Sequence, residues 1–195
     1  MSDVIKPGSG ILFMKVGTHA QESLDQIIGR KLKEIDLVGH TLWGYGGNTC
    51  HPSSMVQPFA RTFAERGEPI HLCMEEMVSN HFGEPLSAAE QSADGQTWER
   101  IPNEIDVRGS RYALVIEALH QDRFLLPLER TRVPVGPSSG RLGSRYVKGK
   151  VDKACLEVLA EAERVNEADR NERPIRFVAT LRPPYAVFLR NFRQD

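Results

Sequence analysis

The residues best suited to chemistry lie between Trp43 and Phe63, where the chain reads WGYGGNTCHPSSMVQPFARTF. Cys50 and His51 are adjacent in this stretch. A cysteine near the start of a helix can have a lowered pKa and act as a nucleophile. Cys50 and His51 are therefore the candidate catalytic residues if the protein is an enzyme. Because adjacent residues of an extended chain point in opposite directions, His51 is poorly placed as the base for Cys50.

The same turn carries groups suited to binding an anion. Gly46 and Gly47 let the backbone adopt positive φ angles and approach a ligand closely. Ser53 or Ser54 opens the helix that follows, and the free N–H groups of a helix start favour a phosphate or a carboxylate. The glycine spacing is neither GxGxxG nor GxxxxGK[ST], so the sequence supports neither a dinucleotide-binding fold nor a P-loop.

Two aromatic residues, Trp43 and Tyr45, alternate to the same side of an expected strand just before this turn. One interpretation is a platform on which a nucleic-acid base stacks. The other is that the two rings are core residues that cover the neighbouring helix.

A zinc site is a further alternative. His71 and Cys73 lie two apart on an expected strand and share a face, and with Cys50 and His51 or His81 they would supply four ligands. The chain has no CxxC or HxxxH spacing, and a buried cysteine on an apolar strand needs no metal to explain it. We therefore assign no metal ligands and leave the cofactor unknown.

The segment 136–150, GPSSGRLGSRYVKGK, contains four bases and no acid. The four bases are Arg141, Arg145, Lys148 and Lys150. Such a glycine- and serine-rich basic loop is typical of phosphate binding, although a solvated connector has the same composition. Arg176 and Arg182 share a face of the closing strands and extend the basic character, with no acid between residues 173 and 193.

The acidic residues gather elsewhere, with eight of them between residues 73 and 106 against one base, Arg100. Charge runs usually stay in water, so a solvated face is one interpretation. The other is an acidic surface, residues 75–106, that occupies a basic groove on a partner protein.

The first half of the chain predicts alternating strands and helices. The expected order is strand 11–16, a helix between Ser23 and Gly39, strand 40–45, helix 53–66 and strand 69–77. Ser23 and Gln26 form a capping-box pattern, and Gly39 is placed to end the helix.

The second half predicts mostly hairpins. Asp94-Gly95 is a turn signal, and two long strands are expected to turn near Gln121-Asp122. A late helix is expected to start at Asp152 with Cys155 facing inward. Two closing strands are expected to hinge at Pro183-Pro184.

These elements predict an α+β fold, a mixed sheet with a βαβαβ first half and a hairpin-rich second half with a late helix. At 195 residues and 40% hydrophobic content, we expect a flexible lead over residues 1–9 and a single compact domain over 10–195. The net charge of −1 gives no general attraction to nucleic acid or to a membrane. Three cysteines without CxxC spacing, and too short an apolar run near the start for a signal peptide, indicate a cytoplasmic protein.

The sequence thus favours a binding module for nucleic acid or a nucleotide that uses the basic loop and the aromatic turn. One alternative is a small enzyme acting on a nucleotide or phosphorylated substrate with Cys50 and His51 at its site. A second alternative is a protein-interaction factor that uses the acidic surface.

Overall fold

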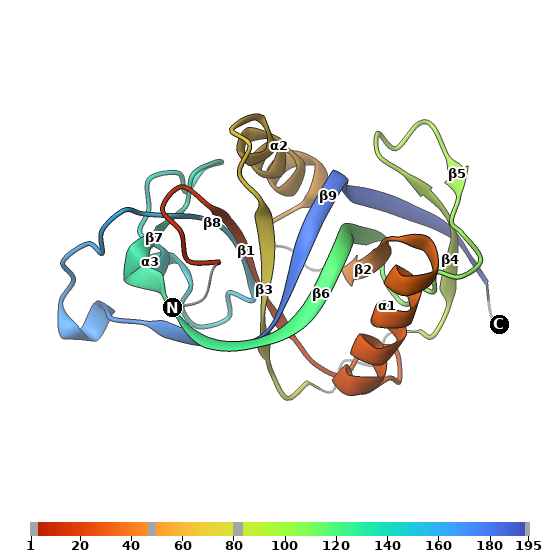
Figure 1. The fold of residues 1–195 in the computed structure, drawn as a ribbon, viewed down its shortest axis with the longest axis horizontal. Coiled ribbons are helices and arrows are strands. Elements are labelled where there is room, and N and C mark those ends of the chain that lie inside the picture. The colour runs from red at the N-terminus through yellow and green to blue at the C-terminus, as the bar shows by residue number, and fades with distance from the viewer. Residues whose placement is uncertain (1–3, 47–49, 80–83, 194–195) are drawn as a thin grey trace. The chain divides into compact units, whose positions relative to one another are not determined.

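The computed structural model describes residues 4–46, 50–79 and 84–193 (Figure 1). In these residues the chain forms one open mixed sheet of nine strands with a few helices, which confirms the α+β class. The strands are β1 Gly10–Val16, β2 Thr41–Tyr45, β3 Ile70–Glu76, β4 Ser87–Ser92, β5 Glu99–Arg100, β6 Tyr112–Pro127, β7 Thr131–Arg132, β8 Lys153–Val158 and β9 Glu172–Arg193. The α-helices are α1 Leu24–Val38, α2 Gln57–Glu65 and α3 Gly143–Tyr146, and shorter helical turns are η1 Pro52–Val56, η2 Leu128–Arg130 and η3 Glu167–Asp169.

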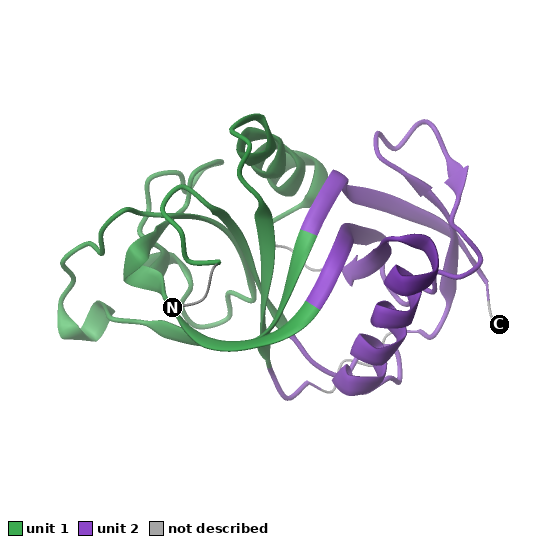
Figure 2. Ribbon diagram, in the orientation of Figure 1, with its two compact units in different colours: residues 1–15, 49–76, 120–180 green, residues 16–48, 77–119, 181–195 purple. Residues whose placement is uncertain are grey.

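The strands follow the order β2-β6-β9-β3-β1-β8-β7, with β4 paired to β9 and β5 paired to β4. The chain divides into two compact units (Figure 2). Unit 1 comprises residues 1–15, 49–76 and 120–180, and unit 2 comprises residues 16–48, 77–119 and 181–195. The long strands β6 and β9 each contribute residues to both units.

Helix α1 begins and ends where its capping residues place it. The backbone N–H of Gln26 donates to the Ser23 hydroxyl at 3.3 Å, and the N–H of Ser23 donates to the Gln26 side-chain oxygen at 2.8 Å. The two bonds form the expected capping box. Gly39 ends the helix with a φ of 78°, a conformation that glycine adopts without steric cost.

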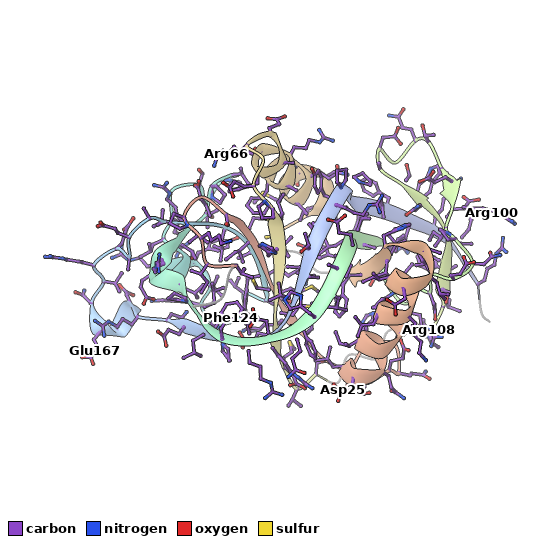
Figure 3. The ribbon with its side chains drawn as sticks, in the orientation of Figure 1. Asp25, Arg66, Arg100, Arg108, Phe124 and Glu167 are labelled. Carbon is purple, nitrogen blue, oxygen red and sulfur yellow. The ribbon has the colours of Figure 1, made fainter. Side chains whose placement is uncertain are left out.

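In unit 1, α2 packs on β1 because β1 begins with a glycine. A β-carbon at Gly10 would lie 2.9 Å from the Phe63 ring and 3.1 Å from the Phe59 ring, so only glycine leaves room for both rings. Arg66, at the C-terminal end of α2 (Figure 3), pairs with Glu157 of β8 at 2.9 Å. Both contacts hold α2, and with it the turn before α2, against the β1–β8 pair.

The core of unit 1 includes part of the expected N-terminal lead. Val4 and Ile5 are buried in the same cluster as Ile11, Phe13 and the strand residues of β8. The backbone N–H of Gly8 donates to the Val158 carbonyl at 2.8 Å. Residues 4–9 therefore belong to the folded structure of unit 1.

Three of the expectations for the second half were wrong. Residues 112–127 form one continuous strand, β6, with no turn near Gln121-Asp122. The segment after Asp152 is strand β8 and not a helix, because it pairs antiparallel with β1, with Cys155 opposite Leu12. Residues 172–193 form one strand, β9, through Pro183-Pro184. The segment KACLEV is buried on both faces, so its sequence lacks the alternation that marks a strand.

The turn at Asp94-Gly95 in unit 2 is confirmed. Gly95 has a φ of 77°, and the Asp94 carboxylate accepts hydrogen bonds from the backbone N–H groups of Gln96 and Thr97, both at 2.8 Å. These bonds lower the pKa of Asp94 to about 2. The core of unit 2 includes a cluster of Leu42, Ala88, Ile101, Ile105, Val107, Ala113, Val115, Val187 and Leu189.

Within the three described ranges, no helix combines the length and the apolar character needed to span a lipid bilayer.

Candidate anion-binding site

The segment 136–150, called here the basic loop, is held in place by backbone hydrogen bonds within unit 1. The N–H of Val133 donates to the Arg141 carbonyl at 2.9 Å, and the N–H of Gly140 donates to the Val133 carbonyl at 2.8 Å. The Asn171 side-chain amide donates to the Val147 carbonyl at 2.7 Å. The basic loop is therefore an ordered part of unit 1 and not a loose connector.

A close approach at Gly143 fixes the middle of the basic loop. A β-carbon at Gly143 would lie 1.9 Å from the Thr131 hydroxyl oxygen and 3.0 Å from the Leu128 carbonyl oxygen. Leu142, Gly143, Ser144 and Val147 are buried, whereas the four cationic side chains of the loop are exposed. The backbone of the loop is thus packed while its charges face solvent.

The basic loop adjoins the turn that precedes α2, called here the corner and comprising residues 50–54. Met55 directly follows the corner, and its side chain lies against Gly136, where a β-carbon would be 2.7 Å from the Met55 sulfur. Cys50 has a φ of 51°, a left-handed conformation that is uncommon for a residue with a side chain. The corner and the start of the basic loop are therefore side by side in unit 1.

A second contact joins the corner to the far part of the basic loop. The Cys50 side chain and burial together raise the pKa of the Cys155 thiol, and Tyr146 lies close enough to both cysteines for them to raise its pKa as well. Burial, reinforced by these two cysteines, raises the pKa of Tyr146. The corner, α3 and β8 thus meet around Cys50.

Polar and cationic groups cover the outer side of this junction. The His51 Nδ1 and the Ser53 hydroxyl are 3.1 Å apart, and His51, Ser53 and Ser54 are exposed. The Arg141 guanidinium lies 5.9 Å from the centre of the Tyr146 ring. The junction therefore presents hydroxyl and imidazole groups from the corner and a cation with an aromatic ring from the basic loop.

The four cations of the basic loop differ in their partners. Arg145 and Lys148 both contact the Asp169 carboxylate, at 3.4 and 2.6 Å, and the hydrogen bond from Lys148 lowers the pKa of Asp169. Among the described residues, Arg141 and Lys150 have no ion-pair partner. Arg145 and Lys148 therefore also anchor the loop, and Arg141 and Lys150 are the cations available to a ligand.

A pocket of about 700 Å³ lies beside the basic loop in unit 1. Asn171, which holds the Val147 carbonyl, is one of its lining residues. Its other lining residues include the glutamates Glu129, Glu163 and Glu172 and the arginines Arg164 and Arg170. Because acids outnumber bases in its lining, this pocket is less suited to phosphate than the basic loop itself.

The arginines of the closing strand are mostly neutralised by acids from the opposite half of the sequence. In unit 1, β9 pairs antiparallel with β3, which places Arg173 against Glu75 and Arg176 against Glu76. The Arg176 guanidinium also lies 4.8 Å from the centre of the Phe177 ring. In unit 2, Arg190 of β9 pairs with Glu90 of β4 at 2.6 Å. Acidic and basic residues occupy different parts of the sequence, but these ion pairs bring them together in the fold. The protein surface is therefore not divided into an acidic and a basic half.

Four of the predicted ligand-binding residues belong to unit 2. Trp43 and Tyr45 are 4% and 1% exposed, so their burial agrees with the core interpretation and not with an open stacking platform. Gly46 is exposed and Arg182 is half-buried. A fifth, Gly47, lies outside the described residues.

The described part of the chain brings no three histidine, cysteine, aspartate or glutamate side chains together as metal ligands. Cys73 lies in the core of unit 1, and burial raises the pKa of its thiol. His71, on the same strand, has its pKa lowered mainly by burial. His81, the other suggested ligand, is outside the described residues.

Sequence reasoning missed the contribution of Cys155 to this junction, because it placed Cys155 on a helix. Met55 and Tyr146 lie within the two segments that were singled out, 43–63 and 136–150, but nothing in the sequence marks either residue as a contact. Cys50 and Cys155 are 105 positions apart, so no local spacing signals their contact. The one feature of the sequence that could have suggested this contact is the presence of three cysteines, because any two of them could lie together in the fold.

Comparison of the chain with protein-family models, with curated proteins and with solved structures found no match.

Proposed function

We propose that unit 1 binds a phosphate-bearing ligand, a nucleotide or single-stranded nucleic acid, on the surface formed by the basic loop and the corner. The observation that carries this proposal is the packing of Met55 against Gly136, which places the polar corner beside a loop with four bases and no acid. Cationic side chains, hydroxyl groups and an aromatic ring are the groups that hold phosphates and bases without sequence preference.

Arg141 and Lys150 have the leading roles, because the other two cations of the loop already contact Asp169. A phosphate beside Arg141 replaces water with a charge-assisted hydrogen bond and needs no existing ion pair to break. Tyr146 is half-buried, and one side of its ring is next to the Arg141 guanidinium. The ring supplies an aromatic surface for a base or a sugar at the same position.

The two alternative functions have less support from the geometry. For an enzyme, the His51 ring contacts Ser53, and Cys50 is only 5% exposed, which leaves its thiol little access to a substrate. For a protein-interaction factor, Glu75, Glu76 and Glu90 are engaged by arginines of β9. These three of the eight acids between residues 73 and 106 are therefore less available to attract a basic partner.

The test is a binding titration with fluorescently labelled single-stranded RNA and DNA, followed by competition with free nucleoside triphosphates. We expect binding at low salt that weakens as the salt concentration increases. Lysine and arginine side chains release counterions from the phosphates when they bind, and this release is less favourable at high salt. Competition by triphosphates identifies a nucleotide site, and its absence identifies the longer strand as the ligand. No binding of any of these probes at low salt contradicts the proposal.

The role of the basic loop is tested with two variants, Arg141→Glu and Lys150→Glu. The control is Arg100→Glu. Arg100 is an exposed arginine of unit 2 (Figure 3), so its reversal changes the net charge equally without altering the basic loop. We expect the loop variants to reduce the slope of log affinity against log salt by roughly 0.7 for each lost contact to a single strand. Equal losses in all three variants indicate attraction by net charge and contradict a site at the loop.

A further inference from the structure

The Asp169 carboxylate lies between two cations of the basic loop. Its Oδ1 accepts a hydrogen bond from the Lys148 Nζ at 2.6 Å, and its Oδ2 is 3.4 Å from the Arg145 Nε. Asp169 belongs to η3, and all three residues are in unit 1. One carboxylate of the chain itself therefore contacts two of the four cations that the basic loop contributes to the ligand surface.

We propose that Arg145 and Lys148 form a second phosphate subsite on this surface, and that Asp169 is an internal competitor which a phosphate displaces from it. The inference rests on the proposed function, because it adds two binding residues and a means of regulation to the same surface. A carboxylate and a phosphate offer the same kind of group to a cation, namely anionic oxygens that accept charge-assisted hydrogen bonds. A phosphate can therefore take the place of the Asp169 carboxylate between the Arg145 and Lys148 side chains.

The two sides of this contact differ in how firmly they are packed. In the basic loop, Gly143, Ser144 and Val147 are buried, and the Asn171 side chain holds the Val147 carbonyl at 2.7 Å. The turn η3, in contrast, contains no buried residue. Displacement of Asp169 therefore moves a surface turn and leaves the packed basic loop in place.

The contacts of Asp169 are weak enough for a ligand to replace. The Asp169 side chain is 26% exposed, and the Arg145 and Lys148 side chains are 55% and 48% exposed. Water and salt screen ion pairs of this exposure, so each contributes little stability. A nucleotide or a nucleic-acid strand brings several negative charges to the surface, whereas Asp169 brings one. The ligand is therefore the stronger partner for the two cations.

Removal of the Asp169 charge should tighten binding. Asp169→Asn keeps the shape of the side chain and leaves Arg145 and Lys148 available to a phosphate. Because two exposed ion pairs no longer oppose the ligand, we expect the affinity for labelled single-stranded RNA and DNA at low salt to rise roughly 2- to 30-fold.

The matched control is Glu167→Gln, on the same turn (Figure 3). Glu167 is exposed, and its side chain has no ion-pair partner among the residues that the structure describes. Both variants remove one negative charge from η3. The difference in affinity between them therefore measures the contact of Asp169 with the two cations and not the change in net charge.

A second set of variants tests whether Asp169 acts through these two cations. In a protein that carries Arg145→Gln and Lys148→Gln, the contact is already absent. Asp169→Asn should then change the affinity no more than Glu167→Gln does. A gain in affinity that persists without the two cations overturns the subsite.

Limited proteolysis measures the displacement in the wild-type protein, so the result does not depend on the folding of a variant. Trypsin cleaves after arginine, and Arg164 and Arg170 are exposed on either side of η3. We expect a saturating single strand to speed cleavage at these two residues, because η3 loses its contacts with the basic loop. Unchanged or slower cleavage at both residues in the complex overturns the displacement of Asp169.

The binding results separate this inference from the proposed function. If the wild type binds and Asp169→Asn binds no more tightly than Glu167→Gln, the inference fails and the proposed function stands. If Asp169→Asn binds and the wild type does not, the function proposed for the wild-type chain fails and the inference stands. Failure of both proteins to bind any of the probes at low salt overturns both proposals. Weaker binding by Asp169→Asn shows that Asp169 positions the two cations for the ligand, which also overturns competition.

Discussion

The Lys31 Nζ lies 2.9 Å from the Glu34 Oε2, and the two side chains, in unit 2, are only 2% and 3% exposed. The Glu34 carboxylate also accepts hydrogen bonds from Arg30 at 3.1 Å, from the Thr41 hydroxyl and from the backbone N–H of Asp106 at 3.1 Å. Lys31 and Arg30 in turn donate to the Asp106 carbonyl. This buried network connects α1 with β2 and with the segment that precedes β6.

The first prediction is that Lys31 makes the stability of the protein depend on pH in the alkaline range. Burial lowers the pKa of Lys31 from 10.5 to about 8. Between these two values the unfolded chain binds more protons than the folded one, so the free energy of unfolding rises as pH increases. The contribution of Lys31 amounts to about 3 kcal/mol over the whole interval. Denaturant titrations from pH 7 to 11 measure it.

The control is Lys31→Met, which keeps the length of the side chain and removes the titrating amine. The raised pKa of Tyr146 acts in the opposite direction at high pH, so the difference between wild type and variant is the quantity to compare. We expect the difference to change steadily between pH 8 and 10.5 and to stay constant below pH 7. A difference that is the same at every pH contradicts a lowered pKa for Lys31.

The second prediction is that Glu34→Gln destabilises the protein strongly. Removal of the charge leaves Lys31 and part of the Arg30 charge buried without their acceptor, and breaking a buried ion pair typically costs about 3–5 kcal/mol. Glu157→Gln is the matched control, because Glu157 pairs with an Arg66 side chain that is 50% exposed. An exposed pair of that kind contributes less than about 1 kcal/mol. Equal losses of stability for the two variants in urea denaturation would show that the Glu34 network contributes no more than an exposed pair, which contradicts the prediction.

The third prediction concerns two helical glycines with opposite responses to alanine. Gly143→Ala should destabilise the protein by about 1–3 kcal/mol, because the new methyl group meets Thr131 and a backbone carbonyl. Gly29, within α1, has no atom within 4 Å of a β-carbon. Gly29→Ala should therefore stabilise by about 0.5–1 kcal/mol through helix propensity alone. A Gly143→Ala variant that melts at the same temperature as the wild type, or higher, would refute the close approach at Gly143, and a Gly29→Ala variant that melts lower would contradict the open space at Gly29.

The fourth prediction is that the ion pairs of β9 differ in strength according to burial. A double-mutant cycle on Glu75 and Arg173 should give a coupling of about 1–2 kcal/mol, because the Glu75 and Arg173 side chains are only 11% and 24% exposed. The corresponding cycle on Glu90 and Arg190, whose side chains are 27% and 46% exposed, should give a smaller coupling, because solvent screens an exposed pair. Neutral substitutions to glutamine in chemical denaturation supply both cycles. A larger coupling for the exposed pair contradicts the prediction.

Local signals predicted the first half of the fold well. The Ser23-Gln26 capping box and Gly39 located both ends of α1, and the order βαβαβ is confirmed. Sequence analysis did not identify Lys31 and Glu34, two charged residues of α1 that are buried. The analysis of periodicity counts only apolar residues, so it does not detect buried polar residues that form hydrogen bonds with one another.

Long-range pairing explains most of the errors in the second half. The strand KACLEV has no alternation, and its pairing with β1 decides its conformation. The arginines of β9 suggested a basic surface, but antiparallel pairing places Glu75 and Glu76 beside two of them. For the candidate site, the basic loop and the corner were identified from composition. Their contact through Met55 and Gly136 depends on the folding of distant segments.

The division of β6 and β9 between two units determines what can be learned from fragments of this chain. The core of unit 1 requires residues from Val4 to Val178, and the core of unit 2 requires residues from Leu42 to Leu189. No continuous stretch of sequence contains one core without most of the other. During synthesis, each hydrophobic interior must wait for late residues to emerge, and shortened versions of the protein would expose apolar surface to chaperones and proteases.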